Sequence, residues 1–366
     1  MNSDGRMQQR LRHEAGALLE QDKVDRIIGF EPGSLKFTTT PLITKIKDDL
    51  DRLVINPFIV NNLAVFLPGL KGRIAIVSKG CDSRSIVSLI QDNKVSRDDL
   101  VIIGIPCPGM IDLRKVEKLT GKDRDEMDDI IREGDKVVIR EGIRDEGYGI
   151  TPDPYPLTLE VSDVLFDNCL ACEFPTPQDY DILLGEPVAS RQSAAGESVE
   201  SQESRVESRG EGDSRAKRLQ SEASSERSVS GLQTINYRLL TRQQRWGFWR
   251  KEFRRCIRCY ACRNICPSCF CKRCFVEESE PQWLMPVPRW QENLMFQVIR
   301  NIHLAGRCTD CGECERSCPM NIPLRSLTME MYNLVGELFN FKAGMDKDAP
   351  PLMTHYEQEE AEDLIR

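Results

Sequence analysis

Two four-cysteine runs in the C-terminal third of the sequence have residue types and spacing that suit metal chemistry. The first run reads Cys-x2-Cys-x2-Cys-x3-Cys-Pro over 256–267, and the second repeats that spacing over 308–319. Thiolates three residues apart can bind three corners of one iron–sulfur cube, and the fourth cysteine then reaches the neighbouring cube. Zinc, the competing interpretation, prefers pairs of ligands to two identical runs closed by proline. The spacing therefore predicts two [4Fe-4S] clusters.

Crossed ligation divides these cysteines into two sets, each made of three cysteines of one run and the last cysteine of the other. The set predicted for the first cluster is Cys256, Cys259, Cys262 and Cys318. The set predicted for the second cluster is Cys308, Cys311, Cys314 and Cys266. The first run also lies among arginines and lysines, whereas the second contains Asp310, Glu313 and Glu315. Because nearby cations stabilise a reduced cluster, we expect the first cluster to have the higher reduction potential.

Two further cysteines follow predicted strands in the N-terminal half of the sequence. Apolar runs at 73–78 and 100–105 predict two buried parallel strands, joined by a helix over 82–91. Cys81 and Cys107 lie just after these strands. This is the edge at which open α/β sheets bind their ligands, so both thiols are candidates for one site.

A Cys-x2-Cys pair, Cys169 and Cys172, supplies two more thiolates on a predicted loop. Together with Cys81 and Cys107 it makes a four-thiolate set, which we expect to bind a third [4Fe-4S] cluster. Zinc binding and unliganded thiols are the alternatives. Three cysteines after the first run remain: Cys269, Cys271 and Cys274. They could hold a substituted cluster, complete a zinc site, replace an N-terminal ligand or form a structural knot.

The overall composition restricts the class of protein. The 366 residues are enough for two or three domains. A net charge of −8 and a pI of about 5.3 argue against nucleic acid as a partner. The most apolar stretch, 53–70, is interrupted by prolines and asparagines, so no membrane span is expected. Fifteen cysteines without a visible secretory signal favour metal ligation in a reducing cytoplasm.

Changes in composition predict four segments along the chain. In order they are an α/β domain with a small parallel sheet and one iron–sulfur site over 1–189, a flexible linker rich in Ser, Glu and Arg over 190–235, a mostly helical two-[4Fe-4S] ferredoxin-like domain over 236–340, and an acidic tail over 341–366. Within the first segment, helices are expected over 43–54 and 58–67.

Three short runs in the N-terminal part carry a family resemblance. They are Lys79-Gly80-Cys81-Asp82, Gly104-Ile-Pro-Cys107, and Cys169-x2-Cys172 followed by Asp181-Ile182 and Gly185. Over about residues 50–190 this part resembles the beta-subunit family of coenzyme F420-reducing hydrogenase and F420-dependent formate dehydrogenase. The resemblance implies that the cysteines bind a [4Fe-4S] cluster beside FAD, which exchanges hydride with a deazaflavin or a nicotinamide.

The C-terminal part carries a second resemblance over about residues 240–340. Its two characteristic runs are Cys256-Ile-Arg-Cys-Tyr-Ala-Cys-Arg and His303-Leu-Ala-Gly-Arg-Cys-Thr-Asp-Cys-Gly. This part resembles the dicluster iron–sulfur subunits of heterodisulfide-reductase-like and NADH- or formate-oxidising complexes of anaerobes. The resemblance implies a subunit that conducts electrons within a larger redox assembly.

No residue of the sequence is assigned to catalysis, since it has three histidines and no GxGxxG fingerprint for a dinucleotide. We therefore expect a non-catalytic subunit that relays single electrons through [4Fe-4S] clusters. Its predicted partners, in a hetero-oligomer, are a flavin- or NAD-binding dehydrogenase subunit and a heterodisulfide-reductase-like or ferredoxin-type redox subunit. The alternative function is a FAD-containing oxidoreductase that exchanges hydride with NAD(P)H or coenzyme F420, and an iron–sulfur sensor is a third possibility.

Overall fold

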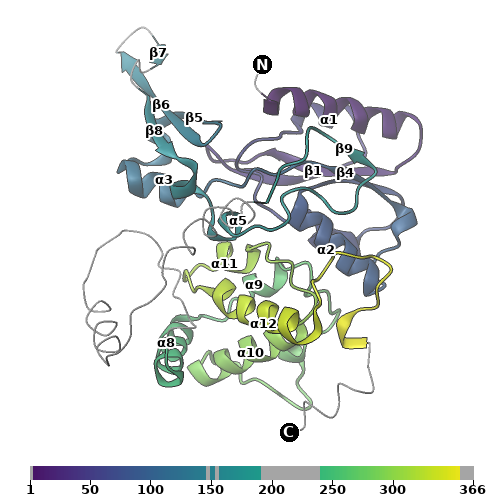
Figure 1. The fold of residues 1–366 in the computed structure, drawn as a ribbon, viewed down its shortest axis with the longest axis vertical. Helices are drawn as coiled ribbons and strands as arrows, with labels where there is room; N and C mark the ends of the chain where they lie inside the picture. Colours follow the sequence, from purple (N-terminus) through teal and green to yellow (C-terminus); the bar gives the residue numbers. More distant parts are fainter. Residues whose placement is uncertain (1–2, 146–148, 153–155, 191–239, 355–366) are drawn as a thin grey trace, which may run out of the picture.

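The structure, a computed structural model, describes residues 3–145, 149–152, 156–190 and 240–354 (Figure 1). All but the first residue of the predicted linker, and the last twelve residues of the predicted tail, lie outside these ranges. None of the helices in the described ranges combines the length and apolar character needed to cross a membrane.

The N-terminal part is built on a five-stranded sheet. In chain order its strands are β1 (Arg26–Pro32), β2 (Thr39–Thr44), β3 (Ile74–Ser78), β4 (Leu100–Gly104) and β9 (Ile182–Leu183). The spatial order is β2-β1-β3-β4-β9, with β2 antiparallel to β1 and the other neighbours parallel. β3 is wholly buried, because α1 (Ser3–Glu20) covers one face of the sheet and α2 (Gly80–Gln91) covers the other (Figure 1). The predicted parallel pair joined by a helix is confirmed.

A second, antiparallel sheet extends from the side of the N-terminal part (Figure 1). It contains β5 (Met127–Glu133), β6 (Lys136–Asp145), β7 (Gly149–Pro152) and β8 (Leu157–Glu160), and β6 pairs with each of the others. Its small core packs beside α3 (Leu113–Thr120) and α4 (Val161–Val164). The sequence analysis missed this sheet because its apolar residues occur in short groups between charged ones.

The C-terminal part is helical, as predicted. Its helices are α8 (Arg242–Arg255), α9 (Ala261–Asn264), α10 (Trp290–His303), α11 (Glu313–Arg316) and α12 (Leu324–Phe339). A capping box starts α8: Gln244 N–H donates to Thr241 Oγ1 at 3.2 Å, and Thr241 N–H donates to Gln244 Oε1 at 2.8 Å. Buried Phe253 of α8 and Phe296 of α10 share one core, which fixes these two helices around the cysteine loops.

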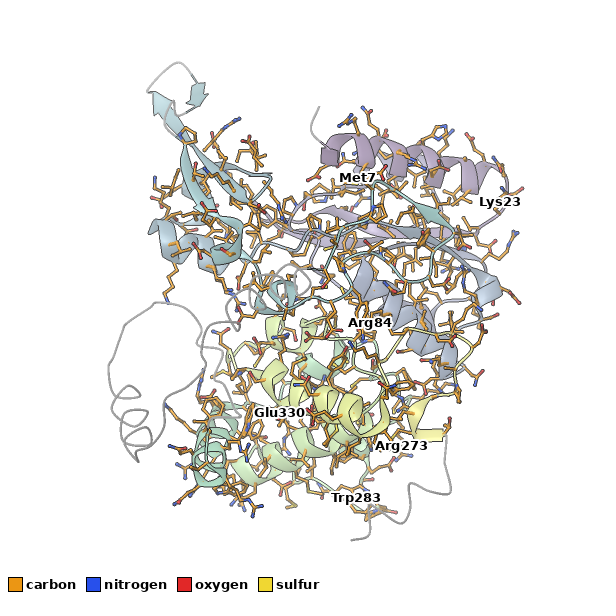
Figure 2. All side chains as sticks on the ribbon, viewed as in Figure 1. Met7, Lys23, Arg84, Arg273, Trp283 and Glu330 are labelled. Atoms are coloured by element: carbon orange, nitrogen blue, oxygen red, sulfur yellow. The ribbon has the colours of Figure 1, made fainter. Side chains whose placement is uncertain are left out.

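The two parts meet along α2, whose far side faces the C-terminal helices (Figure 1). Arg84 of α2 lies at this boundary (Figure 2). Its Nε donates to Ala343 O at 3.0 Å and its Nη1 to Thr309 O at 3.3 Å. Gln91 Nε2, at the other end of α2, donates to Asp346 O at 2.8 Å. The first residues of the predicted acidic tail are therefore bonded to α2.

Two local expectations are wrong. The predicted helices over 43–54 and 58–67 are replaced by the end of β2 and by two 3-10 helices, Lys47–Arg52 and Leu63–Gly69. Edge pairing with β1 draws Leu42 and Ile43 into the sheet, so a tertiary contact overrides the local helical pattern.

Candidate iron–sulfur centres

The two C-terminal cysteine runs fold into matching backbone turns. In each run the residues two and four positions after the first cysteine have a positive φ: Arg258 and Tyr260 at 53° and 60°, and Asp310 and Gly312 at 54° and 76°. A one-turn helix follows in each case, α9 in the first run and α11 in the second. The repeated spacing in the sequence thus corresponds to one repeated loop conformation, which turns successive cysteines toward the same side.

The structure brings the first predicted ligand set together across the two runs. Burial raises the pKa of the Cys256 thiol, and three neighbouring thiols raise it further: those of Cys262, Cys318 and Cys259. Of these neighbours, Cys318 belongs to the other run. Cys256, Cys262 and Cys318 also pack against the core around Phe253 and Phe296.

The second predicted set shows the same exchange of its fourth member. Burial raises the pKa of Cys308 to about 12, with Asp310 as the next cause and the thiols of Cys314 and Cys266 contributing. Cys266 also acts on the thiols of Cys311 and Cys314. The last cysteine of the first run therefore lies among the leading cysteines of the second, as crossed ligation requires.

The three cysteines left over do not form a set of their own. Cys269 lies beside Cys266, whose thiol hydrogen bond lowers the Cys269 pKa. Cys271 is exposed, whereas Cys274 N–H donates to Glu277 Oε2 at 3.0 Å at the start of a short turn. Their predicted role as additional ligands stays a prediction.

The four N-terminal cysteines converge on one cavity of about 140 Å³ at the carboxyl ends of β3 and β4. Cys81, Cys107, Cys169 and Cys172 all line it, and so does Cys311 of the second C-terminal run. Burial raises the pKa of Cys107 to about 12, and the thiols of Cys169 and Cys172 add to the shift. The structure thus joins segments that are up to 91 positions apart in the sequence, from Cys81 to Cys172.

Two glycines allow these segments to approach. A Cβ atom on Gly80 would lie 1.8 Å from the carbonyl oxygen of Phe174, so only glycine lets the start of α2 meet the loop after Cys172. Gly109 has a φ of +99°, and a Cβ there would lie 2.8 Å from the Leu165 side chain. These contacts bring Cys81 to Cys172 and the Cys107 loop to Cys169.

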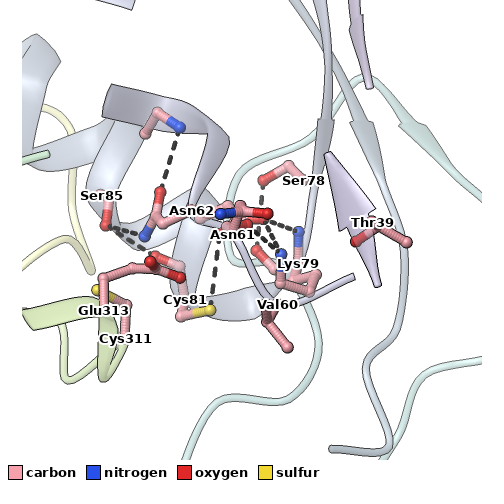
Figure 3. Close-up of polar contacts among 12 residues, drawn as sticks. Thr39, Val60, Asn61, Asn62, Ser78, Lys79, Cys81, Ser85, Cys311 and Glu313 are labelled. Carbon is pink, nitrogen blue, oxygen red and sulfur yellow. Dashed lines mark hydrogen bonds and ion pairs between the residues drawn. The ribbon is translucent and has the colours of Figure 1, made fainter. Parts of the chain in front are cut away.

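A buried ion pair supports the floor of this cavity (Figure 3). Lys79 Nζ donates to Asp82 Oδ2 and to Asn61 O, both at 2.8 Å, and lies 4.5 Å from the centre of the Phe30 ring. Burial lowers the pKa of Lys79, but Asp82 and the thiols of Cys81 and Cys107 raise it more, so the net pKa is raised. Lys79 is therefore a charged group next to two predicted ligands.

Hydrogen bonds connect the N-terminal cavity to the second C-terminal run. Ser85 Oγ and Thr309 Oγ1 are 2.9 Å apart, and Asn168 Nδ2 donates to Cys311 O at 3.2 Å. Figure 3 shows Cys81 and Cys311 at this boundary. The predicted third site and the second cluster site are thus neighbours across the contact between the two parts.

A second cavity, of about 390 Å³, lies on the other side of the Cys107 loop. Lys79 and residues 107–110 line both cavities, while α1, residues 55–59 and the β5–β6 turn complete the second one. Its volume is in the range of small-molecule sites, whereas the four-cysteine cavity is much smaller.

In the described part of the chain, no three His, Cys, Asp or Glu side chains lie close enough together to bind one metal ion. A [4Fe-4S] cube places each thiolate on a separate iron atom, so its ligands stand further apart than those of one zinc ion. The absence of a compact single-ion site among the described residues is therefore no evidence against cubes.

The sequence suggests a basic first run and an acidic second run, but the charges in the structure do not divide so simply. Asp310 accepts from Arg325 Nε at 2.7 Å and Nη2 at 2.6 Å, and Glu313 pairs with Arg316 at 2.7 Å. The acids of the second run are therefore largely balanced. Arg258 of the first run is buried and donates to Met285 O at 2.6 Å, so solvent screens it little. The order of the two potentials stays a prediction.

Two known proteins are similar to this chain over about three quarters of its length. The F420-dependent formate dehydrogenase subunit beta of Methanocaldococcus jannaschii is 27% identical over 308 residues, which cover 76% of this chain and 76% of that protein. This chain is similar in sequence to such beta subunits. The F420-dependent formate dehydrogenase 1 subunit beta of Methanococcus maripaludis is 26% identical over 311 residues, covering 77% of this chain and 75% of that protein.

The 4Fe-4S dicluster domain family matches residues 252–322, which contain both C-terminal runs. This match confirms the prediction of two [4Fe-4S] clusters, while the assignment of individual ligands stays a prediction. A chain of the F420-reducing [NiFe] hydrogenase complex from Methanosarcina barkeri aligns over 45% of this chain and 58% of its own length. Its TM-score of 0.35 and 11% identity are too low to support a shared fold.

Sequence reasoning missed the buried polar residues that surround the predicted centres. Asn293, Gln297 and Arg300 of α10 face the first run: Asn293 Nδ2 donates to Cys256 O at 2.8 Å and Arg300 Nη2 to Cys262 O at 3.1 Å. The signal was their spacing of four and three residues, which places polar side chains on the inward stripe of the helix.

Proposed function

We propose that this chain is the electron-transfer subunit of an oxidoreductase complex and that it relays single electrons through three [4Fe-4S] clusters in series. In order, the clusters are those of the Cys256 set, the Cys308 set and the Cys81 set. The observation that carries the proposal is the four-cysteine cavity, because Cys311 of the second set lines it together with Cys81, Cys107, Cys169 and Cys172.

The residues of the chain hold this series in place. Crossed ligation would join the first two clusters, since each run contributes a cysteine to the cluster of the other. The hydrogen bonds of Ser85 with Thr309 and of Asn168 with Cys311 would hold the proposed third site next to the second. When bound, the cubes supply one-electron chemistry, and the protein contributes their spacing, burial and surrounding charge.

The second cavity favours flavin binding beside the proposed third cluster, at one end of the series. At about 390 Å³ it can hold the ring system of a flavin, and residues 107–110 would separate that ring from the third cluster. A flavin there would supply the conversion between hydride and single electrons. The names of the two relatives support a deazaflavin as the hydride partner. This makes a FAD-containing oxidoreductase the second candidate function.

The proposed assembly is a hetero-oligomer. Both relatives are named as subunits, which supports a chain that works with partners. The proposed partners are a dehydrogenase subunit that binds flavin or NAD and a second redox subunit, one at each end of the series. A reducing cytoplasm suits such thiolate-rich centres.

Iron analysis of the anaerobically purified protein tests the three-cluster proposal. We expect ~12 iron and ~12 acid-labile sulfide per wild-type chain, and ~8 of each after Cys107→Ser. Cys271→Ser is the matched control, since Cys271 is exposed and belongs to no proposed set, and it should keep the wild-type content. A wild-type value of ~8 after full reconstitution would remove the third cluster.

Acid quenching of the same samples tests the flavin candidate. Stoichiometric FAD in the supernatant, lost when Ile59→Trp fills the second cavity, is the expected result. A wild-type preparation with three clusters and no released flavin would leave the electron relay as the function and eliminate the flavoenzyme.

A further inference from the structure

Arg300 is a buried cation between the two C-terminal cysteine runs. It lies on α10 and its residue is only 3% exposed. Its Nη2 donates a hydrogen bond to the carbonyl oxygen of Cys262 at 3.1 Å. Its buried Nε and Nη1 have no close hydrogen-bond partner among the described residues, although a contact with the Cys269 thiol helps to lower the pKa of that thiol. Apart from this thiol, the described residues supply no acceptor for the N–H groups of these two nitrogens.

The neighbours of this guanidinium are thiols rather than carboxylates. The groups that interact most strongly with its charge are four cysteines: Cys266, Cys314, Cys269 and Cys262. Cys262 belongs to the first proposed ligand set, whereas Cys266 and Cys314 belong to the second. No carboxylate of the described residues forms an ion pair with Arg300.

An unpaired buried charge is energetically expensive. Removing one ion from water carries a penalty of several kcal/mol unless an opposite charge and hydrogen bonds offset it. Arg316, the corresponding buried arginine near the third site, has that partner in Glu313 at 2.7 Å. Arg300 has cysteine sulfurs in place of a carboxylate, the Cys269 thiol among them, and a cube with four thiolate ligands, which is itself an anion, would supply the compensating charge.

We propose that Arg300 is a charge-compensating residue shared by the first and second clusters, and that it raises the reduction potential of both. The inference rests on the two C-terminal clusters of the proposed function. The remaining N–H groups of Arg300 donate to cluster or ligand sulfurs, and the charge of Arg300 stabilises the extra electron of each reduced cluster. Because one cation serves both sites, the two potentials are coupled through it.

Gln297 provides a matched comparison on the same helix. It lies one turn before Arg300, is 1% exposed, and its Nε2 donates to Cys262 Sγ at 3.6 Å. It is neutral, and among the described residues its side-chain hydrogen bond goes to a cysteine of the first ligand set. Replacing Gln297 with the similarly shaped Met should therefore lower one potential, whereas replacing Arg300 should lower two.

The test is a potentiometric titration of the anaerobic full-length protein, with EPR detection of each reduced cluster and iron analysis of every sample. Arg300→Gln should shift both C-terminal midpoints downward while the iron content stays at the wild-type value. Arg300→Lys should restore much of the shift, and Gln297→Met should move the first midpoint alone. A downward shift of one midpoint only, or of neither, at full iron content would overturn the proposal.

Loss of a cluster in a variant also decides the question. If Arg300→Gln loses iron and Arg300→Lys retains it, the charge is needed to hold the anionic clusters and the proposal stands. If both variants lose iron equally, shape rather than charge is required and the proposal fails. These outcomes concern the C-terminal pair only, so they are distinguishable from absence of the third cluster, which wild-type iron analysis reports.

Discussion

The two C-terminal cysteine runs and the N-terminal cysteine site bring their thiols together by different structural routes. Each C-terminal run is a local loop whose positive φ angles, 53° and 60° in one run and 54° and 76° in the other, turn its cysteines together. The N-terminal site instead collects three separate segments at the carboxyl edge of a parallel sheet. One route depends on spacing along the chain, and the other depends on the whole fold.

This difference determines where each site is vulnerable. In the local loops, the ligands themselves and their exchange between runs decide the outcome. In the N-terminal site, residues that are not proposed cluster ligands are equally important, because Gly80 and the Lys79–Asp82 pair hold the segments in place. Substitutions can therefore separate the two routes.

The largest expected effect is the loss of a cluster from the opposite run. Cys266→Ala should remove the cluster of Cys308, Cys311 and Cys314, because Cys266 lies among these thiols. EPR of the reduced protein should then lack that signal and keep the signal of the Cys256 set. Cys271→Ala is the control and should keep both. Loss of the Cys256-set signal in Cys266→Ala would show that each run serves its own cluster.

Lys79→Met should destabilise the N-terminal site strongly. It leaves the fully buried Asp82 carboxylate without its partner, and breaking such a pair typically costs about 3–5 kcal/mol. We expect an earlier urea transition by circular dichroism and loss of the third cluster, with the C-terminal pair intact. Adding Asp82→Asn to this variant removes the unpaired charge. The amide oxygen of the asparagine can still accept from the backbone N–H of residue 79, so the double variant should recover much of the stability. Equal stability of all three proteins would contradict the role of the pair.

Gly80→Ala should have a smaller and more local effect. The new Cβ would be 1.8 Å from Phe174 O, so the loop after Cys172 must move, at about 1–3 kcal/mol for overpacking. Gly247→Ala is the control, because its Cβ would meet nothing within 4 Å on the exposed side of α8 and should stabilise by up to about 1 kcal/mol. Iron analysis should show partial loss of the third cluster in Gly80→Ala alone. A full complement there would mean that this close approach is dispensable.

The smallest expected effect is a shift in one potential. Arg258→Gln removes a buried cation from the first run. Reduction of the Cys256-set cluster should then become less favourable by on the order of 1 kcal/mol, which lowers the midpoint potential of that cluster. Arg254→Gln, at an exposed position of α8, should shift it less because water and salt screen that charge. Equal shifts in a potentiometric titration would show that burial does not control the contribution of these cations.

The predictability of each region follows the same division. Local spacing was enough to predict the two clusters, and apolar runs were enough for β3, α2 and β4. The helix expected over 43–54 failed because strand pairing with β1 overrides a local pattern. Arg300 was not found because its importance comes from the burial of a long helix against the cysteine loops, which no short motif encodes.

The central claim is that a third cluster lies next to the second, and the magnetic interaction between them tests it most directly. We expect fully reduced wild-type protein to integrate to ~3 spins per chain, with the signal of the Cys308-set cluster broadened by its neighbour. In Cys107→Ser the count should fall to ~2, and that signal should sharpen. A wild-type signal of ~3 spins whose Cys308-set component is unchanged by Cys107→Ser, or a wild-type count of ~2, would contradict the account.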